Sequence, residues 1–155
     1  MLITRFKVPN NFYYESINPI IMKSTVKWSK NLQSVIDNGR GHQVVIDMPE
    51  AKNGDNQGAT AVELTAMSLA GCIVTIFAIM AAKMRIEFTQ LEIELDSAKT
   101  DNDATITKND YVLKIKTDEP IDKIEKCLKH TIDTCPVGVL FEKAGIPING
   151  KIILL

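Results

Sequence analysis

Histidine, tryptophan and cysteine are scarce in this sequence of 155 residues. It contains one tryptophan, two histidines, His42 and His130, and three cysteines, none of which are spaced as C-x-x-C. Such an inventory makes a zinc site improbable. An odd number of cysteines without a secretion signal also argues against a framework of structural disulfides.

A surplus of charge is missing as well. The formal net charge is −1, from 18 basic and 19 acidic residues, so no general field attracts nucleic acid or anionic membranes. The first residues lack the apolar segment and the cleavage site of a signal peptide. We therefore expect a cytoplasmic protein that binds neither nucleic acid nor membrane. The length suits one domain, residues 21–155, preceded by an N-terminal arm or extra strand, residues 1–20.

Hydrophobic periodicity and turn signals predict strands and helices in both halves of the sequence. The glycine-rich turn at Asn38-Gly39 and Gly41 separates two strands that we expect to form a hairpin. A second hairpin, two further helices and a last strand follow, which gives an α+β domain. The expected strands are 20–29, 42–48, 91–98, 111–118 and 146–155, and the two further helices are 120–133 and 135–145.

A long helix is expected from Thr60 to about Lys83 or Arg85. Thr60 and Glu63 fit a capping box, in which each side chain accepts a hydrogen bond from the other's backbone N–H. No charged residue lies between Glu63 and Lys83, a length close to that of a membrane span. Its many small residues and the lack of Trp or Tyr at its ends favour a buried helix instead. Since so short a chain can hardly surround this helix, we expect a second subunit to cover it in an obligate homodimer.

The three cysteines have different expected roles. Cys72, in the middle of the long helix, reads as a small hydrophobic residue or as a reactive thiol. Cys135 precedes Pro136 at the expected start of a short helix, where the dipole and free N–H groups lower a thiol pKa. Cys127 lies on an apolar helix face and is expected to fill the core.

Two thiols can act together on a peroxide. One is oxidised to a sulfenic acid, the other condenses with it to a disulfide, and an external reductant restores both. Such a site needs a first thiol of low pKa, an apolar pocket and a nearby carboxylate or guanidinium. The residues alone leave open whether Cys72 and Cys135 meet.

Three segments resemble the OsmC/Ohr superfamily. They are "GATAVELTAMSLAGC" (58–72), "IVTIFAIMAAKM" (73–84) and "HTIDTCPVG" (130–138), and the resemblance extends from about Met22 to Leu155. It implies an α+β, OsmC-like intertwined fold, in which antiparallel sheets wrap a long central helix that pairs across a homodimer.

The resemblance also implies an activity. Peroxidase members reduce organic hydroperoxides, and their peroxidatic and resolving thiols match Cys72 and Cys135. No bound cofactor is implied; the reductant is an external dithiol, often of the lipoyl type, and the sites lie at the dimer interface.

The sequence departs from the peroxidases at the partners of the first thiol. They place a glutamate ten residues before it, where this sequence has Val62; Glu63 follows, but is about 180° around the helix from Cys72. Arg40 is the candidate by region for the family's arginine. We expect a thiol peroxidase in which Glu63 or Arg40 assists Cys72, and in which neighbours such as Met67, Leu69, Ile73 and Phe77 favour organic peroxides. The alternative is a dimeric ligand-binding or stress protein of the same fold without turnover.

Overall fold

The computed structural model describes residues 20–155, and its contacts divide the chain into two compact units, Met1–Leu64 and Thr65–Leu155. The predicted N-terminal arm, residues 1–20, lies outside the described residues except for Ile20, and the boundary of the predicted 21–155 domain stays a prediction. The elements are β1 (Thr25–Lys30), β2 (Gln33–Asp37), β3 (Gln43–Ile46), η1 (Glu50–Lys52), α1 (Ala61–Lys83), β4 (Gln90–Ala98), β5 (Lys108–Lys116), α2 (Ile121–Thr134), α3 (Pro136–Lys143) and β6 (Ile148–Leu154).

The first unit contains an antiparallel sheet of order β1-β2-β3. The expected single hairpin between 20–29 and 42–48 was wrong, because β2 lies between those two strands. Asn31 takes a left-handed conformation, with φ of 43°, which asparagine tolerates better than most residues. The chain therefore reverses at Asn31 and again at the predicted turn, where Gly39 and Gly41 have φ of 74° and 85°.

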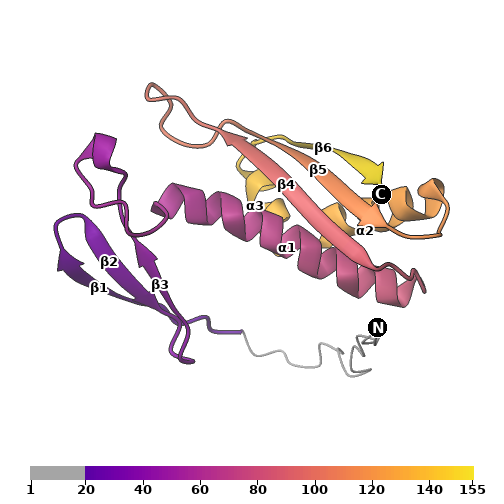
Figure 1. Ribbon diagram of the computed structural model, residues 1–155, viewed down its shortest axis with the longest axis horizontal. Coiled ribbons are helices and arrows are strands. Elements are labelled where there is room, and N and C mark those ends of the chain that lie inside the picture. The colour runs from indigo at the N-terminus through magenta and orange to yellow at the C-terminus, as the bar shows by residue number, and fades with distance from the viewer. Residues whose placement is uncertain (1–19) are drawn as a thin grey trace. The chain divides into compact units, whose positions relative to one another are not determined.

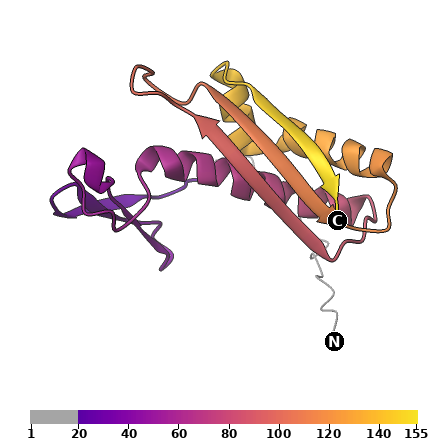
Figure 2. The same ribbon diagram turned by 45° about the horizontal axis from the view of Figure 1, so that its top comes forward.

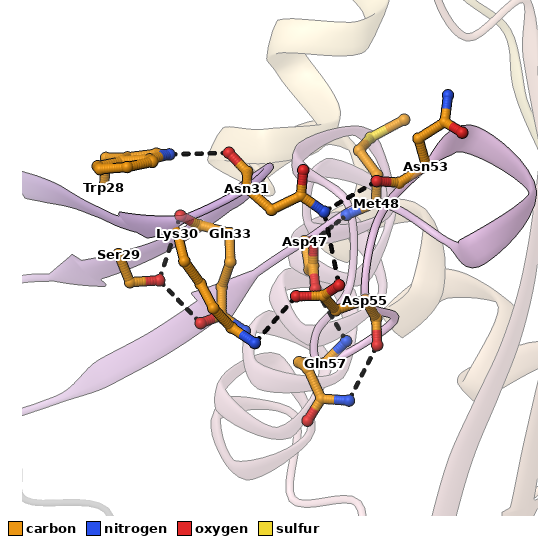
Figure 3. A network of polar contacts seen from close by, with 10 residues as sticks. All are labelled: Trp28, Ser29, Lys30, Asn31, Gln33, Asp47, Met48, Asn53, Asp55 and Gln57. Carbon is orange, nitrogen blue, oxygen red and sulfur yellow. Dashed lines mark hydrogen bonds and ion pairs between the residues drawn. The ribbon is translucent and has the colours of Figure 1, made fainter.

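Polar contacts hold the segment that leads from β3 towards α1 (Figure 3). The buried carboxylate of Asp47 accepts hydrogen bonds from the backbone N–H groups of Met48, at 2.8 Å, and Gln57, at 3.1 Å. Lys30 at the end of β1 forms an ion pair of 3.0 Å with Asp55. These contacts hold the segment to its own unit. The buried carboxylate of Asp47 therefore has hydrogen-bond partners, as buried polar groups usually do.

The helix α1 begins at the predicted capping box. The backbone N–H of Glu63 donates to Oγ1 of Thr60 at 3.1 Å, and the backbone N–H of Thr60 donates to Oε2 of Glu63 at 2.6 Å. The pKa of Glu63 is lowered, chiefly because the Thr60 N–H stabilises its charged form. Glu63 thus has a structural role at the first turn, as the sequence indicated.

Only one stripe of α1 is buried in the single chain. Leu69, Ile73, Phe77 and Ala81 recur at four-residue spacing and are fully buried, as expected for a helix that packs by one face. The opposite face is exposed along Met67, Ser68, Gly71 and Thr75. By length and composition alone, α1 could cross a membrane, with a mean hydropathy of 2.2.

The second unit places a three-stranded sheet over the helices. β4 and β5 form the predicted antiparallel hairpin, with Gln90 opposite Lys116 and Ala98 opposite Lys108, and β6 adds to β5 in parallel. Both views show α1, α2 and α3 along one face of this sheet (Figures 1 and 2). The predicted α+β class is confirmed, and the helix-facing side chains of β5 are buried in the core: Asn109, Tyr111, Leu113 and Ile115.

Candidate functional site

The thiols of Cys72 and Cys135 meet within the second unit. Cys72 comes from the middle of α1, and Cys135 lies at the junction of α2 and α3. The Cys135 thiol donates to Sγ of Cys72 at an S–S distance of 2.8 Å, and both cysteines are free. Since a disulfide bond is about 2.05 Å long, a small movement of the two side chains is enough to join the sulfurs. The structure therefore brings together two residues that are 63 positions apart.

Cys135 is held by both of the helices that it joins. Its backbone N–H donates to the carbonyl of Thr131 at the end of α2, at 2.8 Å. Its Sγ accepts a hydrogen bond from the backbone N–H of Gly138 at 3.3 Å, and Pro136 occupies the first position of α3. The predicted role of Cys135 at the start of this helix is confirmed, and its thiol takes the place of the usual capping oxygen.

The expected lowering of the Cys135 pKa was wrong. Burial, with a smaller contribution from the adjacent Cys72, raises the pKa of this thiol from an ordinary value of 9.0 to about 11. The N–H groups of Gly138 and Val137 act in the opposite direction, but Cys135 has no exposed surface. The cost of charging a sulfur away from water therefore exceeds the stabilisation that the helix N-terminus provides.

The two thiols differ in their access to solvent. Cys72 is half-buried, whereas Cys135 is fully buried. A reagent that enters from solvent therefore reaches the sulfur of Cys72 first. The donated Cys135 S–H also lies where it can stabilise a negative charge on that sulfur.

Cys127 belongs to the core, as expected. It is fully buried on the inner face of α2, and its thiol points to the backbone carbonyl of Phe77 at 3.9 Å. Burial raises its pKa to about 11. Cys127 therefore behaves as a small apolar residue rather than as a third reactive thiol.

The other two predicted site residues lie in the first unit. Glu63 caps α1, and Val62, at the position of the family's glutamate, is 44% exposed. Arg40 is exposed in the turn between β2 and β3, where its backbone N–H donates to Oδ1 of Asn38 at 2.9 Å. The assistance of Glu63 or Arg40 to Cys72 stays a prediction.

The apolar residues expected to favour organic peroxides fall into two groups. Leu69, Ile73 and Phe77 are fully buried in the core stripe of α1, whereas Met67 is 58% exposed. Of these four side chains, Met67 is therefore the one open to a molecule from solvent in the single chain.

A hollow of about 400 Å³ lies on the sheet, and charged side chains contribute to its lining. Neither Cys72 nor Cys135 lines it, and no metal-ligating group of three or more His, Cys, Asp or Glu occurs within residues 20–155. The lining residues are Glu94, Asp96, Asp110, Tyr111, Val112, Asn149, Gly150 and Lys151.

Sequence reasoning missed Gly138. The residue three positions after a helix-capping side chain commonly donates its N–H to that side chain, so counting from Cys135 points to it. A Cβ built on Gly138 would lie 3.5 Å from Sγ of Cys135. The backbone of Gly138 is therefore close to the sulfur. Thr134, the residue before Cys135, donates its hydroxyl to the carbonyl of His130 at 2.6 Å.

Comparisons with known proteins agree on the fold. A family model described as OsmC-like protein matches residues 54–151, which is more than half of the chain. No curated protein matches the sequence. An OsmC like protein from Mycoplasma pneumoniae has a similar structure, with a TM-score of 0.79 and 14% identity over 88% of this chain and 98% of that chain.

Two further solved structures carry names that refer to organic hydroperoxides. An organic hydroperoxide resistance protein from Bacillus subtilis gives a TM-score of 0.60 and 18% identity, over 86% of this chain and 98% of that chain. An organic hydroperoxide resistance protein from Legionella pneumophila, also described as a predicted redox protein, gives 0.65 and 11% over the same shares. At these identities the likeness establishes the fold alone.

Proposed function

Because the chain belongs to the OsmC-like protein family, we propose that it is a thiol-dependent peroxidase that reduces organic hydroperoxides through Cys72 and Cys135. The observation that carries the proposal is the 2.8 Å contact between Sγ of Cys72 and Sγ of Cys135. The structural likeness to organic hydroperoxide resistance proteins supports the class of substrate.

The difference in burial supports an order for the two thiols. Cys72 is the accessible sulfur and attacks the peroxide as a thiolate. A bond forms between this sulfur and the terminal peroxide oxygen, the O–O bond breaks, and the leaving alkoxide takes up a proton to give an alcohol. The product on the protein is a Cys72 sulfenic acid.

Cys135 then resolves the sulfenic acid. Its sulfur attacks Sγ of Cys72, the S–O bond breaks, and water leaves after the hydroxyl takes up a proton. An external dithiol, which we expect to be of the lipoyl type, reduces the resulting disulfide. The contact of Cys135 with Cys72 and its complete burial support this role.

The site is proposed to be complete only in a homodimer. Cys72 borders the exposed side of α1 that includes Ser68, Gly71 and Thr75. A second copy that lies against this side would supply an apolar wall for the alkyl group beside Cys72.

Steady-state turnover tests the proposed function. We expect the reduced protein to consume cumene hydroperoxide faster than hydrogen peroxide when dihydrolipoamide is supplied. Cys72→Ser should fall to the uncatalysed background, whereas Cys127→Ala, the matched core control, should keep its activity per folded molecule. Cys135→Ser should form a sulfenic acid that a dimedone probe traps. Consumption by the unaltered protein at the background rate would overturn the proposal.

The second candidate is a dimeric ligand-binding or stress protein without turnover. Val62 favours it, because this apolar residue stands where the peroxidases have a glutamate, and Glu63 is already engaged by Thr60. For this candidate we expect no peroxide-dependent change in the thiols and a ligand-dependent rise in melting temperature with small apolar compounds.

A further inference from the structure

The two sulfurs of the thiol pair would not be equivalent to an incoming reductant. In thiol–disulfide exchange a thiolate attacks one sulfur, and the other sulfur leaves with the negative charge. Cys72 is half-buried and Cys135 has no exposed surface. Attack on Cys135 would require a reductant to penetrate the junction of α2 and α3, so access favours attack on Cys72.

Burial disfavours a negative charge on Cys135 and raises its pKa to about 11, so a thiolate that leaves from this position depends on the donors around it. Sγ of Cys135 lies 3.3 Å from the backbone nitrogen of Gly138, which already donates a hydrogen bond to it. The N–H of Val137 also favours the charged form of this thiol. Both groups belong to the first turn of α3, whose dipole places partial positive charge there. A negative charge that develops on Cys135 is therefore met by donors that need no movement.

The backbone of Gly138 lies close to the sulfur of Cys135, and the space beside it admits one further carbon atom. A Cβ at this position would contact Cβ of Cys135 at 3.4 Å and Sγ at 3.5 Å. Alanine therefore fits in ordinary van der Waals contact. The third position of a helix makes no intrahelical bond through its N–H, so this donor is available to the sulfur alone.

We propose that a dithiol reductant attacks Sγ of Cys72, that Cys135 leaves as a thiolate, and that the backbone N–H of Gly138 stabilises it. A bond forms between the reductant sulfur and Cys72, and the Cys72–Cys135 bond breaks. The second thiol of the reductant then attacks the reductant sulfur that is bonded to Cys72. This step releases Cys72 and turns the reductant into a cyclic disulfide. Both protein thiolates take up protons from water. The proposal rests on the proposed function, whose product is this disulfide.

Mapping of the mixed disulfide on the unaltered protein tests the direction of attack. The Cys72–Cys135 disulfide is made with diamide, treated with 2-mercaptoethanol, quenched with N-ethylmaleimide and mapped by peptide mass. We expect mercaptoethanol on Cys72 and maleimide on Cys135. Mercaptoethanol mainly on Cys135, or equally on both, would overturn the inference, as would the failure of diamide to join the two cysteines.

Variants at Gly138 test the role of the donor. Gly138→Ala retains the N–H, and Gly138→Pro removes it without removing an intrahelical hydrogen bond. We expect dithiothreitol to reduce the disulfide at an unchanged rate in Gly138→Ala and about tenfold more slowly in a folded Gly138→Pro, since charge-assisted hydrogen bonds are strong. Equal rates in the unaltered protein and folded Gly138→Pro would remove Gly138 from the mechanism. If Gly138→Pro does not fold, the mapping decides the direction alone.

Because diamide forms the disulfide without peroxide, this inference and the proposed function fail separately. A protein that does not consume cumene hydroperoxide, but gives the Cys72 adduct after diamide, loses the proposed function and keeps the direction of exchange. A protein that turns over peroxide and gives the Cys135 adduct keeps the proposed function and loses the direction of exchange.

Discussion

At the scale of single residues, burial outweighs local position for the thiols. Cys135 occupies a helix N-terminus and accepts a hydrogen bond from Gly138, yet its pKa is raised to about 11. Burial raises the pKa of Cys127 to about the same value. Cys72 is the only one of the three cysteines with appreciable access to solvent, and for this reason it is the sulfur assigned to the peroxide.

We predict that the protein loses stability at alkaline pH because the thiol of Cys127 is buried. Its folded-state pKa of about 11 lies above the ordinary value of 9.0, so the unfolded chain loses this proton first. The stabilising contribution is complete below pH 9 and is lost as the pH rises towards 11. Between pH 8 and pH 10.5 we expect the free energy of unfolding of the reduced protein to fall by roughly 2 kcal/mol more than in Cys127→Ala.

Urea unfolding at the two pH values measures this difference. The cavity in Cys127→Ala lowers stability at both pH values, so the readout is the change in the free energy of unfolding between them. The lysines titrate alike in both proteins and do not affect this comparison. An identical decline in the two proteins would contradict a raised pKa at Cys127.

The candidate residues were predictable from the sequence, but their environment was not. The positions of Cys72 and Cys135 followed from motif and helix signals, and Glu63 was identified as a cap. The S–S contact and the burial of Cys135 depend on how α1 packs against the α2–α3 junction. Such long-range packing has no local signature, and it reversed the expected pKa shift.

At the scale of elements, local signals placed most helices and strands. The capping box at Thr60, Pro136 at the start of α3 and the alternation along β4 and β5 are all present in the structure. The strand β2 was missed because its turn relies on Asn31 rather than on a glycine or proline. The parallel addition of β6 is set by packing and not by its composition.

Gly150 on β6 is predicted to be intolerant of a side chain. A Cβ there would lie 2.1 Å from Cζ of Tyr111, which is buried on the adjacent strand. The ring has to move within a packed core, so Gly150→Ala should lower the free energy of unfolding by about 1 to 3 kcal/mol.

A double-mutant cycle isolates the cause. With Tyr111→Leu in the background, Gly150→Ala should cost much less, because the clashing ring is gone. If the cost of Gly150→Ala is the same in both backgrounds, the contact with Tyr111 is not its origin.

At the scale of the whole molecule, the unpaired face of α1 requires explanation. It is uncharged along Met67, Ser68, Gly71 and Thr75, and it is exposed in the single chain. The hydroxyls of Ser68 and Thr75 bond to carbonyls of their own helix, at 2.7 and 2.9 Å, so the face offers little polarity to water. The family and fold are those of small soluble proteins, and a second copy of this helix is the expected cover.

A charge on this face should break the proposed homodimer. We expect Thr75→Arg to be monomeric at micromolar concentration, because a buried unpaired charge is costly, while the unaltered protein sediments as a dimer. Glu125→Arg, at an exposed position of α2, is the matched control and should stay dimeric. A Thr75→Arg protein as dimeric as this control would show that α1 does not pair through that face.

The two touching thiols are proposed to react as a pair when peroxide is added. The most direct measurement adds one equivalent of cumene hydroperoxide to the reduced protein, counts free thiols and maps disulfides by peptide mass. We predict rapid loss of two of the three thiols and a Cys72–Cys135 bond, with Cys127 still reduced and a slower reaction with hydrogen peroxide. Three remaining thiols, or a disulfide that includes Cys127, would contradict it.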